Sequence, residues 1–361
     1  MRITPNITMQ NSLYNIQTTR ARMDSIQEKI ASGYNYNRPS DDPVSVSLLV
    51  NMNDRMTVAD QYSSNISKSD TWLKMTNTAL TGMNDFVEMA KKAVSALSGG
   101  ETDPNVVNNA LLSLKSIKQN IVDMGNTQLN GVYLFSGTKS LTKPFLINSG
   151  DTTSGSPTIS NLDSVTGLSA GMPISGAGIP TGTTITAVNA GPPASLTLSA
   201  NATATATGAA LNTYAGDGGV TSIEINQGVT QAINFPGNQV LAPTAPGGPY
   251  GNVDILATMD QLIADVAASN IAGIQAGKQQ LYQAGIQLNA AQSDLQSRLV
   301  RLDSANTMNK TIISTLQTVY GNIQNVDYAQ LGIEMSQQEI ALNATYSSTA
   351  KISQMSLLDY L

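Results

Sequence analysis

Apolar residues recur every three or four positions along much of this chain, the spacing that gathers side chains on one face of an α-helix. Near the start, this spacing predicts a helix over residues 1–33 that ends at Gly33. Near the end, it predicts a helix over residues 325–361 with one polar gap at Gln338. The residues on the two faces are Met9, Leu13, Ile16, Met23, Ile26 and Ile30 in the first helix and Leu331, Met335, Leu342, Thr345, Thr349 and Ile352 in the second.

The other faces of these two terminal helices carry Ser, Thr, Asn and Gln in place of charged residues. Such residues are mediocre helix formers, so both helices need packing partners to be stable in water. We therefore expect the two ends of the chain to pair. The pattern leaves open whether the pair is an ordinary coiled coil within one chain or a surface through which chains polymerise.

A long helix is predicted over residues 44–97, because apolar positions alternate by three and four residues along it. The alternation passes through Asp70 and Asn77, and polar residues at such positions tend to fix the register of a coiled coil. It skips one residue at Leu80 and then continues to the end of the segment. The segment is therefore predicted to be a long coiled-coil helix with two polar interruptions.

The predicted partners of this helix lie on both sides of the β material. Gly99-Gly100 break the helix, and a second helix from about Pro104 completes an antiparallel hairpin. A short helix is expected over residues 256–266. The most regular alternation of the chain then runs from Leu281 to Ile323 without a slip, and we expect this segment to pack against the 44–97 helix.

The composition changes between the two halves of the helical pattern. From Lys143 to Lys278 the chain has no further Lys or Arg, and Gly, Thr, Ala, Ser and Pro dominate. Short β-branched runs separated by Gly- and Pro-rich turns predict an all-β insertion over residues 151–213. Strands within 214–240, around an Asp217-Gly218 turn, are expected to pair with the β pattern over 131–147.

The predicted fold is therefore mainly α with an all-β insertion. The N- and C-terminal helices pair in a long coiled-coil bundle, and the β region lies at its far end. The expected divisions are an N-terminal helix over 1–40, a helical hairpin with the first strands over 41–150, the insertion over 151–213, returning strands and a long helix over 214–324, and a C-terminal helix over 325–361.

Composition and charge exclude several kinds of chemistry. The chain has no Cys and no His, which removes thiol nucleophiles, disulfides, histidine bases and the usual zinc ligands. A net charge of −6 argues against nucleic-acid binding. No apolar run reaches membrane-spanning length and the start lacks a signal-peptide core, so we expect neither membrane insertion nor a cleaved signal. No cofactor is expected, and no pattern supports an enzyme, although a glycosidase that uses only carboxylates is compatible with the composition.

The segment between the first two helices carries a dense polar motif: Arg38, Pro39, Ser40, Asp41, Asp42 and Pro43. Pro43 suits the first position of a helix and Asp42 the N-cap before it. Arg38 is expected to pair with Asp41 or Asp42. An adjacent acidic pair also suggests a cation site, but it lacks the spaced oxygen ligands of a calcium loop, so capping is the favoured interpretation.

Three stretches of the sequence resemble the bacterial flagellin family: Arg2-Ile3-Thr4, SGYNYNRPSDDP at Ser32–Pro43, and ISQMSLLDYL at Ile352–Leu361. The resemblance covers roughly the first 145 and the last 110 residues. Typical filament flagellins carry KDDAAG-like residues where this chain has PSDDP, and they end differently. These two departures favour the members of the family that stand at the junction between hook and filament.

The resemblance implies a structural protein without an active site, an axial component of the bacterial flagellum that joins hook to filament by self-assembly. It implies export through the flagellar type III apparatus to an extracellular position, with the help of an export chaperone. The implied partners are copies of the same chain, a neighbouring hook-associated protein and flagellin. The residues expected at the assembly interface are Leu13, Ile16, Met23, Ile30, Leu342, Tyr346, Ile352, Leu357 and Leu358.

Two other functions are compatible with the sequence. One is an atypical flagellin that forms the filament itself. The other, from a different class, is a surface binding module that acts through the β insertion. A junction protein occupies one short band of the flagellum, whereas flagellin is found along the whole filament, so localisation distinguishes the junction protein from the atypical flagellin. Glycan binding by residues 151–213 tests the surface binding module.

Overall fold

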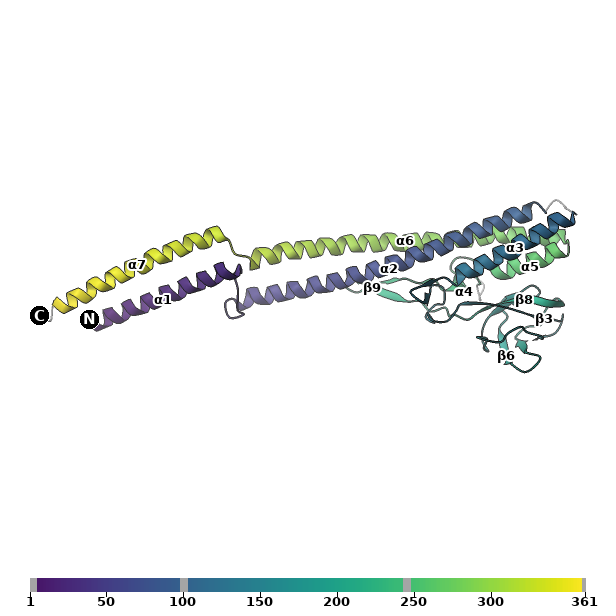
Figure 1. Ribbon diagram of the computed structural model, residues 1–361, viewed down its shortest axis with the longest axis horizontal. Helices are drawn as coiled ribbons and strands as arrows, with labels where there is room; N and C mark the ends of the chain where they lie inside the picture. Colours follow the sequence, from purple (N-terminus) through teal and green to yellow (C-terminus); the bar gives the residue numbers. More distant parts are fainter. Residues whose placement is uncertain (1–4, 98–102, 243–247, 359–361) are drawn as a thin grey trace. The chain divides into compact units, whose positions relative to one another are not determined.

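A computed structural model describes residues 5–97, 103–242 and 248–358 of the chain (Figure 1). The chain divides into two compact units, one formed by residues 1–61 with 308–361 and the other by residues 62–307. Helices α2 and α6 contribute to both units. The helices are α1 (Pro5–Ser32), α2 (Pro43–Ser95), α3 (Pro104–Gly125), α4 (Gly237–Val240), α5 (Ile255–Ala267), α6 (Ile271–Gln324) and α7 (Tyr328–Leu358).

In the first unit, α1 and α7 lie side by side, purple and yellow in Figure 1. They run antiparallel, because Arg20 of α1 lies over Tyr346 of α7 while Gly33, just after α1, lies beside the hydroxyl of Tyr328. The predicted end of the first helix is confirmed: Gly33 adopts a φ of +78°, a left-handed conformation that glycine reaches without strain. The expected pairing of the two ends of the chain is confirmed as well.

The covered face of this pair follows a three-and-four alternation on both helices. On α7 the prediction is confirmed as far as the side chains are described, and the face comprises Leu331, Met335, Gln338, Leu342, Thr345 and Thr349. On α1 it comprises Ser12, Ile16, Thr19, Met23, Ile26 and Ile30. The prediction is wrong for Met9 and Leu13, which are 48% and 49% exposed, because Ser12 and Thr19 continue the stripe toward the start of the helix.

In the second unit, α2 and α6 pack antiparallel in one register, as predicted. The amide nitrogen of Asn84 donates to the amide oxygen of Asn289 at 3.4 Å. Further along, the amide nitrogen of Gln296 donates to Asn77 at 3.2 Å. The two residue numbers have the same total in both pairs, as they must when antiparallel helices keep one register.

The buried stripe of α2 differs from the predicted one in its middle. Ser69 and Thr76 are buried, at 1% and 0% exposure, and Asp70 and Asn77 lie beside the stripe, half-buried. Each buried hydroxyl donates to a helix carbonyl one turn earlier, at 2.8 and 3.0 Å, so a small polar side chain can fill a core position. The alternation therefore needs no skip at Leu80. The stripe does contain two polar residues, but they are Ser69 and Thr76, and the prediction of Asp70 and Asn77 at these positions is wrong.

Two shorter helices begin with the caps that their sequences favour. Asp103 accepts the N–H of Asn105 at the start of α3, and Pro104 stands at the first helical position, as predicted. Asp254 accepts the N–H of Ala257 at 2.8 Å at the start of α5. Gly99 and Gly100, predicted to separate α2 from α3, lie outside the described residues. The short helix α4 was not expected from the sequence.

The β region contains ten strands: β1 (Gln128–Leu129), β2 (Val132–Tyr133), β3 (Phe145–Thr152), β4 (Thr158–Ile159), β5 (Ile174–Gly176), β6 (Ile185–Asn189), β7 (Ser195–Leu198), β8 (Ala206–Tyr214), β9 (Ser222–Asn226) and β10 (Val229–Ala232). The sheets have the orders β1-β2, β10-β9, β3-β8-β5 and β4-β7-β6, and all described pairings are antiparallel. Asn130 and Gly131 join β1 to β2 with positive φ angles of 53° and 80°, as a tight hairpin turn requires.

The sheet β3-β8-β5 separates two hydrophobic cores. One face places Phe145 and Tyr214 in the larger core, which α2, α3, α5 and α6 also form. The opposite face places Leu211 and Ile174 in a smaller core made by the insertion alone. Since side chains alternate between the faces of a strand, one sheet serves both cores. The mainly α fold with an all-β insertion is confirmed.

The pairing expected for residues 214–240 is wrong. β9 pairs with β10 through a turn at Gly228, whose φ is 70°, and the partner of β3 is β8. The Asp217-Gly218 stretch precedes both strands and serves another purpose. The hydroxyl and amide of Thr138 both donate to the carboxylate of Asp217, at 2.6 and 2.7 Å, and fasten this segment to the loop after β2.

Candidate functional site

The assembly residues expected from the sequence fall into three groups. Leu13 and Tyr346 are exposed, at 49% and 37%. Four others are half-buried on the covered face of the α1–α7 pair: Ile16, Met23, Ile30 and Leu342. The last three lie in α7 with side chains outside the described part of the chain: Ile352, Leu357 and Leu358. The structure therefore assigns the expected residues to two different surfaces, one inside the pair and one facing outward.

The outward surface contains apolar residues that the sequence reasoning missed. Ile333 and Ile340 of α7 are 62% and 67% exposed, and Tyr14 of α1 is 68% exposed. Ile333 and Ile340 are seven residues apart, so they share one face of α7, opposite the covered one. That spacing was the signal available in the sequence. Within the described residues of α1 and α7, only Ile26 and Leu331 are fully buried, so this pair leaves much of its apolar surface open.

The loop between α1 and α2 has the predicted helix cap. The carboxylate of Asp42 accepts the N–H groups of Val44 and Ser45 at 3.1 and 3.2 Å and the hydroxyl of Ser45 at 2.6 Å. The bonds from Ser45, with that from Val44, hold the pKa of Asp42 below its usual 3.8. Pro43 opens α2. The capping prediction is therefore confirmed.

The prediction that Arg38 pairs with Asp41 or Asp42 is wrong. Its guanidinium contacts Glu28 of α1 at 3.3 Å, and both side chains are exposed. Asp41 accepts instead the backbone N–H groups of Asn37 and Arg38, at 3.1 and 2.9 Å. Two local backbone donors already satisfy Asp41, so the arginine is free to reach back to the first helix. Pro39 and Ser40 lie exposed at the turn.

A groove of about 300 Å³ lies beside this loop within the first unit. Its walls include Tyr36 and Pro39 from the loop, Val50 from α2 and Tyr320 from α6. Val44, at the start of α2, is 79% exposed nearby in sequence. The loop thus lies next to a concave, partly apolar surface that no side chain of the described unit fills.

The described residues offer little chemistry of other kinds. Within residues 5–97, 103–242 and 248–358, no three Asp or Glu side chains gather closely enough to hold a metal ion. No helix in these ranges is long and apolar enough to cross a membrane.

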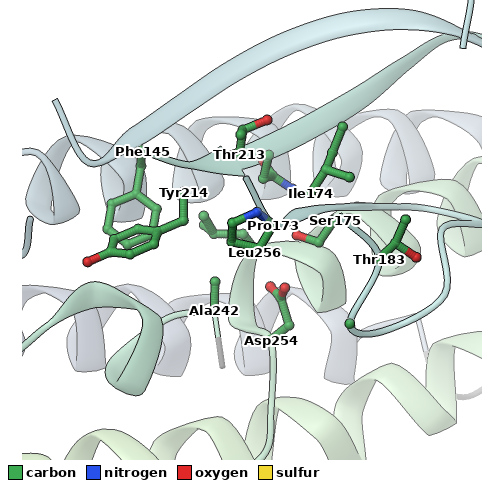
Figure 2. A pocket seen from close by; sticks show the side chains of 12 residues that line it. Phe145, Pro173, Ile174, Ser175, Thr183, Thr213, Tyr214, Ala242, Asp254 and Leu256 are labelled. Carbon is green, nitrogen blue, oxygen red and sulfur yellow. The ribbon is translucent and has the colours of Figure 1, made fainter. Parts of the chain in front are cut away.

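The insertion contributes a cavity at its contact with α5 (Figure 2). The cavity holds about 20 Å³, room for one water molecule and for no larger ligand. Phe145 and Tyr214 close one side, and the carboxylate of Asp254 points into it from below, toward Ser175. Burial raises the pKa of Tyr214 well above its usual 10. This cavity therefore belongs to the packing of the insertion on the helices.

Known proteins match parts of this chain. Residues 3–140 match the family model of the bacterial flagellin N-terminal helical region. Flagellar hook-associated protein 3 of Salmonella typhimurium is 22% identical over 146 residues, which are 40% of this chain and 46% of that protein. Its counterpart in Escherichia coli is 22% identical over 160 residues, 44% of this chain and 50% of that protein. The chain thus matches about half the length of these two relatives.

A solved structure supports the fold. A Vibrio parahaemolyticus protein described as a flagellar hook-associated protein is 19% identical, with a TM-score of 0.54 over 79% of this chain and 100% of that one. The match of residues 3–140 to the family model confirms the resemblance to the N-terminal helical region of bacterial flagellins. The chain is also similar to flagellar hook-associated protein 3.

Proposed function

We propose that this protein is a structural component of the bacterial flagellum that joins hook to filament by assembling with copies of itself. The observation that carries the proposal is the apolar surface that α1 and α7 leave open. Ile333, Ile340 and Tyr14 are each more than 60% exposed, on helices with few charges. Soluble proteins seldom expose such a stripe unless a partner covers it.

The charge pattern of the terminal helices supports the same function. Residues 5–19 of α1 contain no charged residue, and neither do residues 340–350 of α7. Only Ile26 and Leu331 are buried within the described part of this pair, so contacts within one chain stabilise it weakly. Packing against neighbouring subunits supplies the missing burial, and we propose that the two helices become fully ordered at that step.

The partners follow from a position between hook and filament. They are copies of this chain, a neighbouring hook-associated protein and flagellin. An export chaperone covers the apolar terminal helix before assembly, and export through the flagellar apparatus brings the chain to the cell exterior. The names of the relatives support a flagellar position, and these finer assignments are part of the proposal.

A second candidate is an atypical flagellin, favoured by the match to the flagellin N-terminal region. The two candidates predict different places in the flagellum. A junction protein labels one short band next to the hook, whereas a flagellin labels the whole filament. Immunogold labelling of whole flagella with an antibody against residues 153–205 distinguishes them.

A strain without the gene provides the matching functional test. If the protein joins hook to filament, the cells make hooks, release flagellin into the medium and do not swim. Complementation with the full chain restores filaments. Normal filaments in the deletion strain would contradict the proposal.

A further inference from the structure

The β insertion is seated on α5 by two polar residues that face each other in its sheet. Ser175 of β5 and Asn212 of β8 are register partners, so both side chains leave the same face. The amide nitrogen of Asn212 donates to the carboxylate of Asp260 at 2.5 Å, and Ser175 lines the same small cavity as Asp254. Figure 2 shows Ser175 and Asp254 directed toward each other. One sheet therefore contacts one helix through two separate carboxylates.

These two carboxylates differ in charge balance. Lys118 of α3 donates to Asp260 at 2.6 Å, and both side chains are less than 10% exposed. No Lys or Arg in the described ranges bonds to Asp254, which accepts the N–H of Ala257 at 2.8 Å. The Asp260 contact is therefore a neutralised ion pair, whereas ionised Asp254 carries a charge without a counter-ion.

The surroundings of Asp254 disfavour its ionised form. As a residue it is half-buried, but its carboxylate points inward beneath the sheet (Figure 2). Burial, with a smaller contribution from the negative charge of Asp260, raises the pKa of Asp254 from 3.8 to about 6. From the sheet, Tyr214 is the titratable group at this face, and its hydroxyl bonds elsewhere, to the carbonyls of Phe135 and Asp217.

An open groove lies on the other side of Asp254. This groove of about 620 Å³ is bounded by Gly176 and Thr181 of the insertion and by Gln261 and a second carboxylate, Asp265, of α5. A small separation of β5 from α5 therefore brings water to the carboxylate of Asp254. β5 is the edge strand of its sheet, so it can separate without breaking the ladder between β3 and β8.

We propose that the contact between Ser175 and Asp254 is a proton-dependent latch on the insertion. When Asp254 carries a proton, β5 is held against α5. When Asp254 is ionised, β5 separates more readily, because water then solvates the charge. The neutralised contact between Asn212, Asp260 and Lys118 stays closed and acts as the hinge. Protonated Asp254 stabilises the closed form. This stabilisation is fully present below about pH 4 and is lost as the pH rises through about 6.

Hydrogen exchange of the full-length protein tests the latch. After correction for the intrinsic exchange rate, the opening constant of the β5 amides should rise about tenfold between pH 5 and pH 7.5, the ratio that a shift from 3.8 to about 6 gives. The amides of β3 should show no such rise. Asp254→Asn keeps the helix cap and removes the charge, so the rise at β5 should disappear.

A matched variant controls for changes in α5 itself. Asp265→Asn alters the second carboxylate of the groove, which accepts from Gln261 and Asn270 and does not line the cavity beside Ser175. It should keep the pH dependence at β5. The proposal is overturned if the wild-type opening constant does not change with pH, or if Asp254→Asn shows the same rise as the wild type.

Discussion

The guanidinium of Arg298 lies over the ring of Phe235, with 4.2 Å between the guanidinium carbon and the ring centroid. Arg298 stands in the α6 stripe at a position whose neighbours along the stripe are buried leucines. Its N–H groups donate to the carbonyl of Asn234 at 3.1 Å and to Asp294 at 2.7 Å. This single side chain therefore ties the segment after β10 to the long helix while remaining paired and hydrogen-bonded.

Replacement of Arg298 by Lys should lower the free energy of unfolding by about 1–2 kcal/mol, because an ammonium group cannot stack on the ring and reach both acceptors. Urea unfolding, followed through the single tryptophan Trp72, measures the change. Arg301→Ala, on the exposed face of the same helix, is the matched control and should change stability by less than about 0.5 kcal/mol. If Arg298→Lys lowered the free energy of unfolding no more than Arg301→Ala does, the stacking and hydrogen bonds of Arg298 would not contribute to stability.

Asp42→Ala should lower the melting temperature of the helical region, whereas Asp42→Asn should have little effect, because Asn also caps helices. The pKa of Asp42 is held low by its bonds from Ser45, so its stabilising effect is present at neutral pH and is lost as the pH falls below 3.8. Melting curves followed by circular dichroism at pH 7 and pH 3 should show the difference between wild type and Asp42→Ala narrowing in acid.

A different result for the Asp42 variants would give this loop another role than helix capping. If Asp42→Asn and Asp42→Ala both abolished filament attachment without lowering the melting temperature, the loop would be a contact to a neighbouring subunit. Arg38→Ala then provides the check, because the guanidinium of Arg38 is exposed and, within the described residues, bonds only to Glu28. Loss of attachment in that variant would locate the contact at the rim of the adjoining groove.

The buried pair of Lys118 and Asp260 should respond differently to single and double replacement. Lys118→Met leaves a buried carboxylate without its cation and should cost about 3–5 kcal/mol at neutral pH. Adding Asp260→Leu removes that charge and should restore most of the lost stability. The deficit of the single variant should also shrink as the pH falls, since protonation of Asp260 removes the uncompensated charge. A double variant as unstable as the single one would contradict this account.

Replacing Ile333 and Ile340 by Ser should leave the soluble protein as stable as the wild type and should prevent filament attachment. Both side chains are mostly exposed, so little burial is lost within one chain. Leu331→Ser, on the covered face of the same helix, should instead weaken the α1–α7 pair. Melting curves and a swimming assay in a strain lacking the chromosomal copy measure the two effects. Wild-type swimming by the double variant would exclude this stripe from assembly.

The helices were predictable because their signals are local and repeat over many turns. The alternation from Leu281 to Ile323 identified most of α6, and Gly33 identified the end of α1. The same rule failed where polar residues occupy covered positions. Ser69 and Thr76 of α2 donate to their own helix backbone and so enter the core, which a count of apolar residues cannot anticipate. On α1, Ser12 stands on the covered face, where the count of apolar residues placed Leu13.

The contacts of the β region could not be predicted, because they join residues that are far apart in the sequence. β3 pairs with β8 across the whole insertion, whereas the sequence analysis predicted pairing with the strands that follow residue 214. The network under the sheet draws Lys118, Asn212 and Asp260 from three elements. None of these residues stands in a local pattern that marks it as buried, so only the tertiary structure brings them together.

The ladder between β3 and β8 has a consequence for how this protein can change. Thr152 and Ala206 are paired at its outer end, so the segments that lead into and out of residues 153–205 lie side by side. Whatever lies between them can grow, shrink or be exchanged without moving the register of α2 against α6. The outer end of this ladder is thus a position where a foreign domain can be inserted, provided that the termini of that domain lie close together.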